Sequence, residues 1–335
     1  MTATYRRPFL VLDIAKRTKG YEMDVAAATD FATTLARLEP EPGVPDGLLP
    51  YCFDAAAERV LFTRTPDMAR TLAAPFLYQA QYAGAEHLVS VPLERLDVEP
   101  AAPMTPTFVL SVSRCGSTLL STLLHHARHP AASEPDIYTQ LAAMPPDQRN
   151  RIGAAGRLAI IRGSTVSLAG RIGSAVVIKL RDHCNDIALQ LAAAVPEARM
   201  AFMLRDRLAW ANSRHRAFND SPAALADILR RGVLTFDALA RAGHCPLLIW
   251  YEDLLANPHA TLARLDVPAA ALDGAGLSAV LARDAQAGTS ISQENTGRRR
   301  LSDGDAAGFE AAWAAAAPRE ALRRNGLDRL LPPGG

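Results

Sequence analysis

From residue 107 onward, short apolar runs alternate with stretches of helical periodicity. The run Phe108–Val112 is followed by Ser117–His126, in which leucines recur at helical spacing. The same order is repeated in three further pairs of expected strand and helix, which are Ala175–Ile178 with Asp186–Ala194, Met200–Leu204 with Leu208–Phe218, and Pro246–Trp250 with Pro258–Leu265. Strands that alternate with helices predict an α/β fold, with a parallel β-sheet and helices on both of its faces.

The first hundred residues lack this regular alternation. They contain alanine-rich helical pieces and three short strand-like runs, Phe9–Leu12, Arg59–Phe62 and Leu88–Val91. Proline and alanine then crowd together without periodicity around Pro100, Pro103 and Pro106, which is typical of a linker. We therefore expect an N-terminal accessory lobe at residues 1–103, of a role that the sequence leaves open, and a second domain at residues 104–335.

Composition narrows the classes of function. Hydrophobic residues make up 49% of the chain, enough for a sizeable core. With 36 basic and 35 acidic side chains the net charge is +1, so neither nucleic acid nor an anionic membrane is an expected partner. No apolar run is long enough for a membrane span. The chain is rich in alanine and arginine, which resembles a bacterial protein, and its dispersed cysteines favour a reduced, cytoplasmic setting over a disulfide framework; these are Cys52, Cys115, Cys184 and Cys245.

A short glycine-containing turn joins the first of these strands to its helix. Its sequence is Ser113-Arg114-Cys115-Gly116-Ser117-Thr118. A helix N-terminus after such a turn presents free backbone N–H groups and a positive dipole end to an anion. Gly116 permits close approach, Ser117 and Thr118 add hydroxyl donors, and Arg114 adds a fixed charge for phosphate or sulfate oxygens. Taken alone, the turn leaves a simpler alternative open, in which Ser117 merely caps the helix.

The turn differs from the phosphate loop of nucleotide triphosphatases. That loop has the pattern GxxxxGK followed by Ser or Thr, and both its lysine and its first glycine are missing here. We therefore do not expect magnesium-dependent hydrolysis of ATP or GTP. A small-molecule kinase of P-loop type remains the closest enzymatic alternative, and a non-catalytic nucleotide-binding protein is a second one.

A second candidate anion element follows the expected strand Met200–Leu204. Arg205 ends that strand, and Ser213 comes eight positions later, about two turns inside the next helix. The two side chains could converge on one phosphate group. Alternatively, Arg205 pairs with the neighbouring Asp206 and Ser213 is an ordinary residue of the helix surface.

Taken together, these segments resemble the family of sulfotransferases that use 3′-phosphoadenosine 5′-phosphosulfate (PAPS), over roughly residues 107–300. The stretch FVLSVSRCGSTLLSTLL is similar to the family's 5′-phosphosulfate loop, and ARMAFMLRDRLAWANS is similar to its 3′-phosphate element. LLIWYEDLLANP resembles a segment whose tyrosine lies near the adenosine. The resemblance implies a P-loop-like fold and transfer of a sulfuryl group from PAPS to a hydroxyl or amine acceptor, leaving 3′-phosphoadenosine 5′-phosphate (PAP). It makes residues 104–335 the sulfotransferase domain.

The resemblance also implies which residues bind the donor. They are Arg114, Cys115, Gly116, Ser117, Thr118, Leu119, Arg205, Ser213 and Tyr251. Arg298, Arg299 and Arg300 stand about where the family has a basic C-terminal segment, but the Arg-Lys-Gly triplet of its cytosolic members is absent, so which of them contacts the 3′-phosphate stays open. The acceptor, a small molecule or a peptide, stays unidentified, and its pocket is expected from residues 136–170, 219–240 and the accessory lobe. The oligomeric state is likewise open.

Sulfuryl transfer needs a base for the acceptor's proton and cations for the donor's oxygens. Glu134, in Ala132-Ser133-Glu134-Pro135, resembles the glutamate base of bacterial and protein-tyrosine-type members, and His183 is a second choice. Arg114 and Lys179 are the expected catalytic cations, although Lys179 could instead pair with Asp182. Three further histidines are expected to serve the dipole at a helix C-terminus rather than a metal, and no metal is expected; they are His125, His126 and His129.

Overall fold

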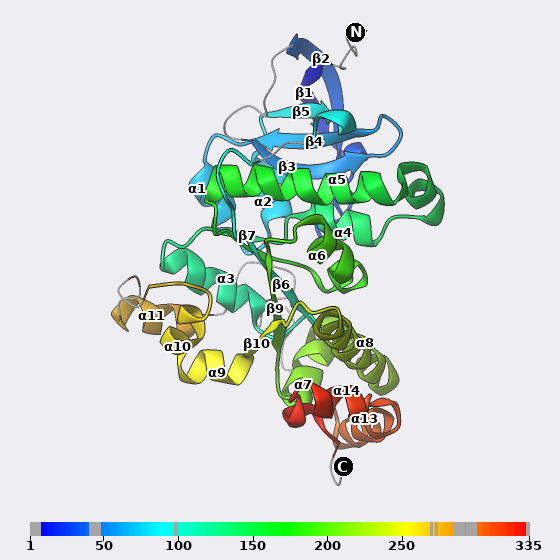
Figure 1. The fold of residues 1–335 in the computed structure, drawn as a ribbon, viewed down its shortest axis with the longest axis vertical. Coiled ribbons are helices and arrows are strands. Elements are labelled where there is room, and N and C mark those ends of the chain that lie inside the picture. Colours follow the sequence, from blue (N-terminus) through cyan, green and yellow to red (C-terminus); the bar gives the residue numbers. More distant parts are fainter. Residues whose placement is uncertain are drawn as a thin grey trace. The chain divides into compact units, whose positions relative to one another are not determined.

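The computed structural model describes residues 8–39, 48–96, 100–268, 271, 274–283, 292 and 300–332. The chain divides into two compact units that interleave along the sequence (Figure 1). The first unit comprises Met1–Phe108 and Pro130–Ala198, and the second comprises Val109–His129 and Arg199–Gly335. The expected domain border at residue 103 stays a prediction.

The predicted α/β fold with a parallel sheet flanked by helices is confirmed. Five strands follow one another in the order β10-β9-β6-β8-β7, and their bounds are β6 (Thr107–Ser111), β7 (Ala131–Ser133), β8 (Val177–Lys179), β9 (Arg199–Leu204) and β10 (Leu247–Trp250). β9 runs parallel to β10, and β7 runs parallel to β8. All five residues of β6 are buried, which explains why its centre, Phe108–Leu110, is continuously apolar rather than alternating.

Most of the helices and strands predicted from hydrophobic periodicity lie close to their predicted positions around this sheet. Helix α3 (Ser117–His126) has the predicted limits, and α7 (Arg207–Phe218) begins one residue early because the side chain of Asp206 accepts hydrogen bonds from the N–H groups of Leu208 and Ala209. The helix expected at 186–194 is shorter, α6 (Ala188–Ala194), and follows a 3-10 segment, η3 (Asp182–Ile187).

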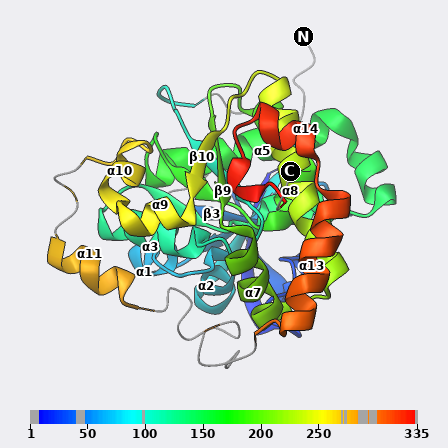
Figure 2. The same ribbon diagram turned by 90° about the horizontal axis from the view of Figure 1, so that it is seen from below.

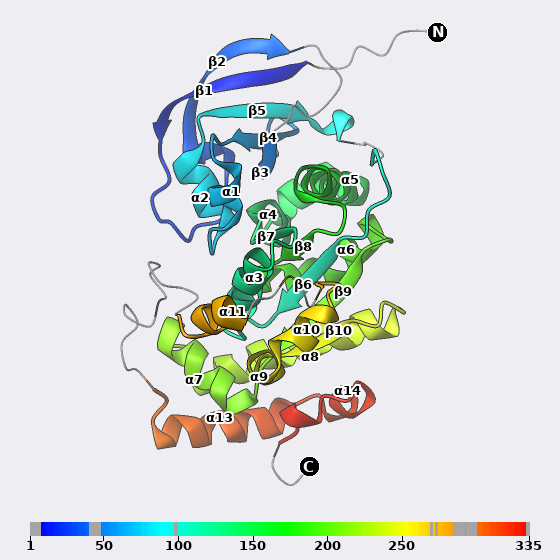
Figure 3. The ribbon, with the colours of Figure 1, turned by 90° about the vertical axis from the view of Figure 1, so that its left-hand side faces the viewer.

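The first unit also holds an antiparallel sheet of five strands in the order β2-β1-β5-β4-β3 (Figure 3). The strands are β1 (Phe9–Arg17), β2 (Phe31–Glu39), β3 (Leu48–Asp54), β4 (Arg59–Arg64) and β5 (His87–Pro92). The three predicted runs lie within β1, β4 and β5, whereas β2 and β3 were not predicted. Pro50 argues against a strand in the sequence at this position. The structure accommodates the proline because β3 is an edge strand whose register shifts between Pro50 and Cys52.

Short helices and one long helix complete the first unit. They are η1 (Ala28–Asp30), α1 (Met68–Leu72), α2 (Leu77–Gly84), η2 (Leu93–Arg95), α4 (Asp136–Ala142) and α5 (Pro146–Ile172). Both α4 and α5 pack beside β3 (Figure 1). The amide of Gln140 on α4 accepts from the N–H of Phe53 at 2.6 Å and donates to its carbonyl at 2.7 Å. A side chain thus satisfies backbone groups of this edge strand.

The second unit adds helices after the strands of the parallel sheet. They are α8 (Pro222–Arg241), α9 (Tyr251–Ala256), α10 (Pro258–Ala263), α11 (Gly274–Leu281), α13 (Asp303–Ala316), α14 (Arg319–Arg324) and η5 (Asp328–Leu330). Both α13 and α14 pack against α8 (Figure 2). The guanidinium of Arg324 contacts both carboxylate oxygens of Asp237 at 3.0 Å, which ties α14 to α8. None of the described helices is long and apolar enough to cross a membrane.

Candidate functional site

The turn between β6 and α3 has the geometry of an anion-binding helix N-terminus. Gly116 precedes the first helical residue in the left-handed region, at φ 86°. Arg114 is also left-handed, at φ 64°, a conformation that a side chain rarely adopts. Ser117 and Thr118 are each 6% exposed, at the start of the helix. Helix α3 therefore begins within the predicted phosphosulfate loop, and the N–H groups of its first turn lie there.

Gly116 lies directly against the ring of Tyr251. A Cβ atom at this position would be 2.2 Å from Cδ2 of Tyr251. Only glycine fits there, because any side chain would both overlap the ring and strain the backbone. The structure thus brings together the predicted phosphosulfate loop and the predicted adenosine-side tyrosine.

Two side chains of α7 that sequence reasoning missed hold the turn in place. The indole N–H of Trp210 donates to the carbonyls of Val112 and Ser113, at 3.1 and 2.9 Å. Nη1 of Arg214 donates to the hydroxyl of Ser113, while its Nε contacts Asp220 at 2.7 Å. A signal was present, because Trp210 and Arg214 are four residues apart and share a helix face.

Arg205, at the end of β9, stacks on the same tyrosine. Its guanidinium carbon is 4.4 Å from the centre of the Tyr251 ring, within the range of a cation–π contact. The Nε atom of Arg205 is buried and has no hydrogen-bond partner in the part of the chain that the structure describes. The alternative of an Arg205–Asp206 pair is not realised, since the Asp206 carboxylate caps α7 instead.

Ser213 is a buried residue of α7, 4% exposed, rather than an ordinary surface residue. A later segment of the chain contacts the residue before Ser213: the N–H of Leu301 donates to the side-chain oxygen of Asn212 at 3.2 Å. Arg300, the preceding residue, is exposed there. Arg298 and Arg299 lie outside the described residues.

In the first unit, Glu134 and Lys179 form a nearly buried ion pair. Their side chains are 10% and 4% exposed. β7 places Glu134 and β8 places Lys179, because Ser133 and Lys179 are in register in the parallel pair and the N–H of Glu134 donates to the carbonyl of Lys179 at 2.7 Å. Lys179 therefore pairs with Glu134, and the alternative partner Asp182 contacts His183.

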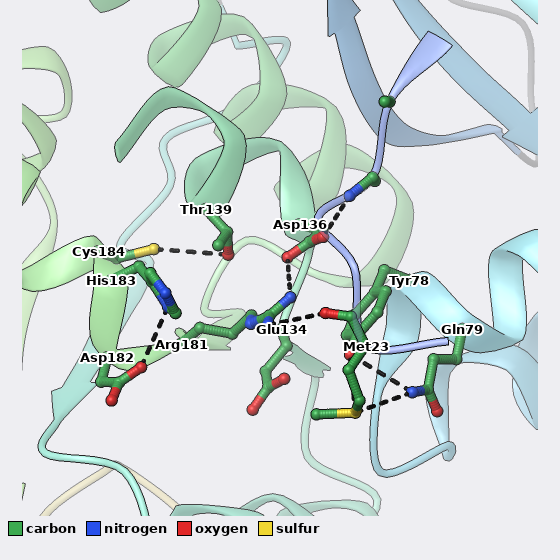
Figure 4. Close-up of polar contacts among 12 residues, drawn as sticks. Met23, Tyr78, Gln79, Glu134, Asp136, Thr139, Arg181, Asp182, His183 and Cys184 are labelled. Carbon is green, nitrogen blue, oxygen red and sulfur yellow. Dashed lines mark hydrogen bonds and ion pairs between the residues drawn. The ribbon is translucent and has the colours of Figure 1, made fainter. Parts of the chain in front are cut away.

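A second buried pair, which the sequence did not reveal, follows Glu134 (Figure 4). The carboxylate of Asp136, fully buried, accepts from Nη1 of Arg181 at 3.1 Å and from the N–H of Ala26 at 2.6 Å. Burial lowers the pKa of Arg181, but Asp136, then Tyr78 and Glu134, outweigh it, so that the pKa is raised. Arg181 therefore lies within the electrostatic field of Glu134.

The candidate histidines lie after β8 and at the end of α3. The side chain of His183 is 53% exposed and lies 3.2 Å from Asp182, whose hydrogen bond raises the pKa of the imidazole. His125 and His126 lie in the last turn of α3, where they were expected to face the helix dipole. Within the described ranges, no group of three or more His, Cys, Asp or Glu residues could hold a metal ion.

Comparison with known proteins gives similarity only at the level of solved structures. No family model and no curated protein matches the chain. The chain is similar to the sulfotransferase domain from the Synechococcus PCC 7002 olefin synthase, with 18% identity and a TM-score of 0.38 over 69% of this chain and 97% of that one. It is also similar to retinol dehydratase in complex with androsterone and inactive cofactor PAP, with 15% identity and a TM-score of 0.31 over 68% of this chain and 81% of that one.

Replacing Gly116 with alanine tests the contact with Tyr251. In the Gly116→Ala variant, the left-handed backbone costs about 1–2 kcal/mol for an alanine, and overlap of its Cβ with the tyrosine ring costs roughly 1–3 kcal/mol more. We expect the free energy of unfolding to fall by the sum of the two. The matched control is Gly326→Ala, because Gly326 is also left-handed, at φ 64°, but nothing lies within 4 Å of its added Cβ. Urea denaturation measures both variants, and equal losses would contradict the close contact.

Proposed function

We propose that the protein is a sulfotransferase that moves a sulfuryl group from PAPS to a hydroxyl or amine acceptor and releases PAP. One observation carries the proposal. The anion-binding turn at Gly116 packs on Tyr251, and the cation of Arg205 stacks on the same ring. Anion donors and an aromatic ring held together in this way suit a nucleotide that carries phosphate groups and a purine.

Each part of the donor then has a residue to bind it. The first-turn N–H groups of α3, with Ser117, Thr118 and Arg114, bind the 5′-phosphosulfate. Arg205 and the buried Ser213 bind the 3′-phosphate, together with Arg300 from the returning chain. Support comes from the buried Nε of Arg205, which has no hydrogen-bond partner among the described residues and can donate to an anion.

Glu134 accepts the proton of the acceptor's hydroxyl or amine in this proposal. The acceptor atom forms the new bond to sulfur, and the bond from sulfur to the bridging oxygen breaks, so that its electron pair leaves with PAP. The ion pair with Lys179 supports the role, since it holds the carboxylate of Glu134 in a defined and nearly buried place. His183 is less suited, because the hydrogen bond to Asp182 raises its pKa and favours a protonated ring.

Lys179 and Arg114 supply the positive charge for the sulfuryl oxygens, and the proposal needs no metal. The acceptor is a small molecule or a peptide. A cytoplasmic setting fits the cysteines, because the four described cysteines form no disulfide with one another; Cys52, Cys115 and Cys184 are buried.

Arg205→Met tests the assignment of the 3′-phosphate. Loss of a charge-assisted contact, worth roughly 1.5–3 kcal/mol, should weaken PAP binding by about ten- to a hundred-fold. Binding of adenosine 5′-phosphosulfate, which lacks the 3′-phosphate, should change far less. Calorimetry measures both ligands, with Arg231→Met as the control because Arg231 is an exposed residue of α8. Equal losses for the two ligands would refute the assignment.

Glu134→Gln tests the base. The amide keeps the shape of the side chain but cannot take the proton, so turnover should fall by about 10²–10⁴-fold while PAP binds normally. Release of PAP is measured from PAPS with a panel of alcohol, phenol, amine and tyrosine-peptide acceptors. Glu197→Gln is the control, since Glu197 is half-buried and paired with Arg162. Unchanged turnover of Glu134→Gln would remove Glu134 as the base.

A further inference from the structure

The backbone at Glu134 is strained and needs support from its surroundings. Its φ of 57° is left-handed, although the residue carries a long side chain and stands between β7 and Pro135. Such a conformation costs on the order of 1–3 kcal/mol and persists only where neighbouring contacts enforce it. We call Ser133–Asp136 the base turn.

On one side, the residues before α2 hold the base turn. The hydroxyl of Ser133 donates to the carbonyl of Pro75 at 2.6 Å. The ammonium of Lys179 lies 5.7 Å from the centre of the Phe76 ring. The residues that precede α2 therefore contact both the turn and the lysine that pairs with Glu134.

On the other side, Arg181 joins the turn to the loop before η1. One nitrogen of its guanidinium donates to Asp136, and the other donates to the carbonyl of Met23 at 3.1 Å. Asp136 accepts from Ala26 of the same loop. The guanidinium also lies over the ring of Tyr78, 5.2 Å from its centre. Figure 4 shows the side chain of Arg181 between Asp136 and Met23, with Glu134 beside it.

We infer that Arg181 is a positioning residue for Glu134, and that it acts by fastening the base turn to Met23–Ala26 and to Tyr78. This inference rests on the proposed role of Glu134 as the base. The inference gives a part in catalysis to residues that connect strands of the antiparallel sheet. Met23 and Ala26 lie between β1 and β2, and Pro75, Phe76 and Tyr78 lie between β4 and β5. They set where the carboxylate of the base stands, without touching the reacting atoms.

The arginine is required for its shape as well as its charge. A guanidinium presents several donors in a rigid fork, so one side chain reaches Asp136 and Met23 together. A lysine keeps the charge beside Asp136 but offers a single nitrogen. Arg181→Lys should therefore preserve the buried charge balance and release the loop, whereas Arg181→Met would leave Asp136 buried without its cation.

The fastening itself is tested by amide hydrogen exchange on the whole chain. In Arg181→Lys, exchange should accelerate in peptides that cover residues 22–27 and 133–137. The matched control, Arg162→Lys, removes the fork of another half-buried arginine of the same unit, paired with Glu197. It should leave both peptides unchanged. Unchanged exchange in Arg181→Lys would overturn the inference, whatever the activity of the wild-type protein.

A double-mutant comparison tests whether Arg181 acts through Glu134. Arg181→Lys should lower kcat for PAP release by about ten- to a hundred-fold, the effect of misplacing a catalytic group by about 1 Å, and leave KM for PAPS unchanged. In the Glu134→Gln background the same change should cost little more. Additive losses, or a raised KM for PAPS, would contradict the positioning role. Absence of PAP release by the wild-type protein would instead contradict the proposed function. The hydrogen-exchange experiment would still test whether Arg181 holds the base turn against Met23–Ala26.

Discussion

The contact between Gly116 and the ring of Tyr251 is the constraint on which the candidate donor site depends. It fixes the turn before α3 against the residue that opens α9, and no larger residue fits at position 116. Trp210 and Arg214 hold the turn from α7, and Arg205 adds its charge to the same ring. The ends of β6 and β9 thus place the candidate anion-binding turn and the guanidinium of Arg205 against the tyrosine ring that follows β10.

Two of the residues proposed for chemistry share an unusual backbone. Arg114 and Glu134 are both left-handed, and such positions commonly occur at functional sites because surrounding contacts can hold a strained residue in a defined place. For Glu134 those contacts are visible in Asp136 and Arg181, and in the segments around Met23 and Tyr78. The proposed base is therefore held by a network in which several partners come from the first hundred residues.

Local signals in the sequence predicted the parallel sheet and helix α3, and they also marked the residues proposed to bind the donor, whose role stays a prediction. Leucine spacing marks α3, and Arg205, Ser213 and Tyr251 stand in recognisable segments. The buried pair of Asp136 and Arg181 left no such signal, because its partners Ala26 and Met23 are 110 and 158 positions away in sequence. Strand β3 escaped for a different reason, since Pro50 argues against a strand unless its place at the sheet edge is known.

Calorimetric titration of the wild-type protein with PAP, and separately with ATP and magnesium, tests the central claim of a PAPS site most directly. We predict saturable binding of PAP, and a stabilisation against thermal unfolding that reaches about 2.7 kcal/mol at a hundred times Kd. ATP with magnesium should bind much more weakly, because the turn has Arg114 and Cys115 before Gly116 and lacks the lysine of a triphosphate loop. Strong binding of ATP with magnesium, together with no binding of PAP, would contradict the claim.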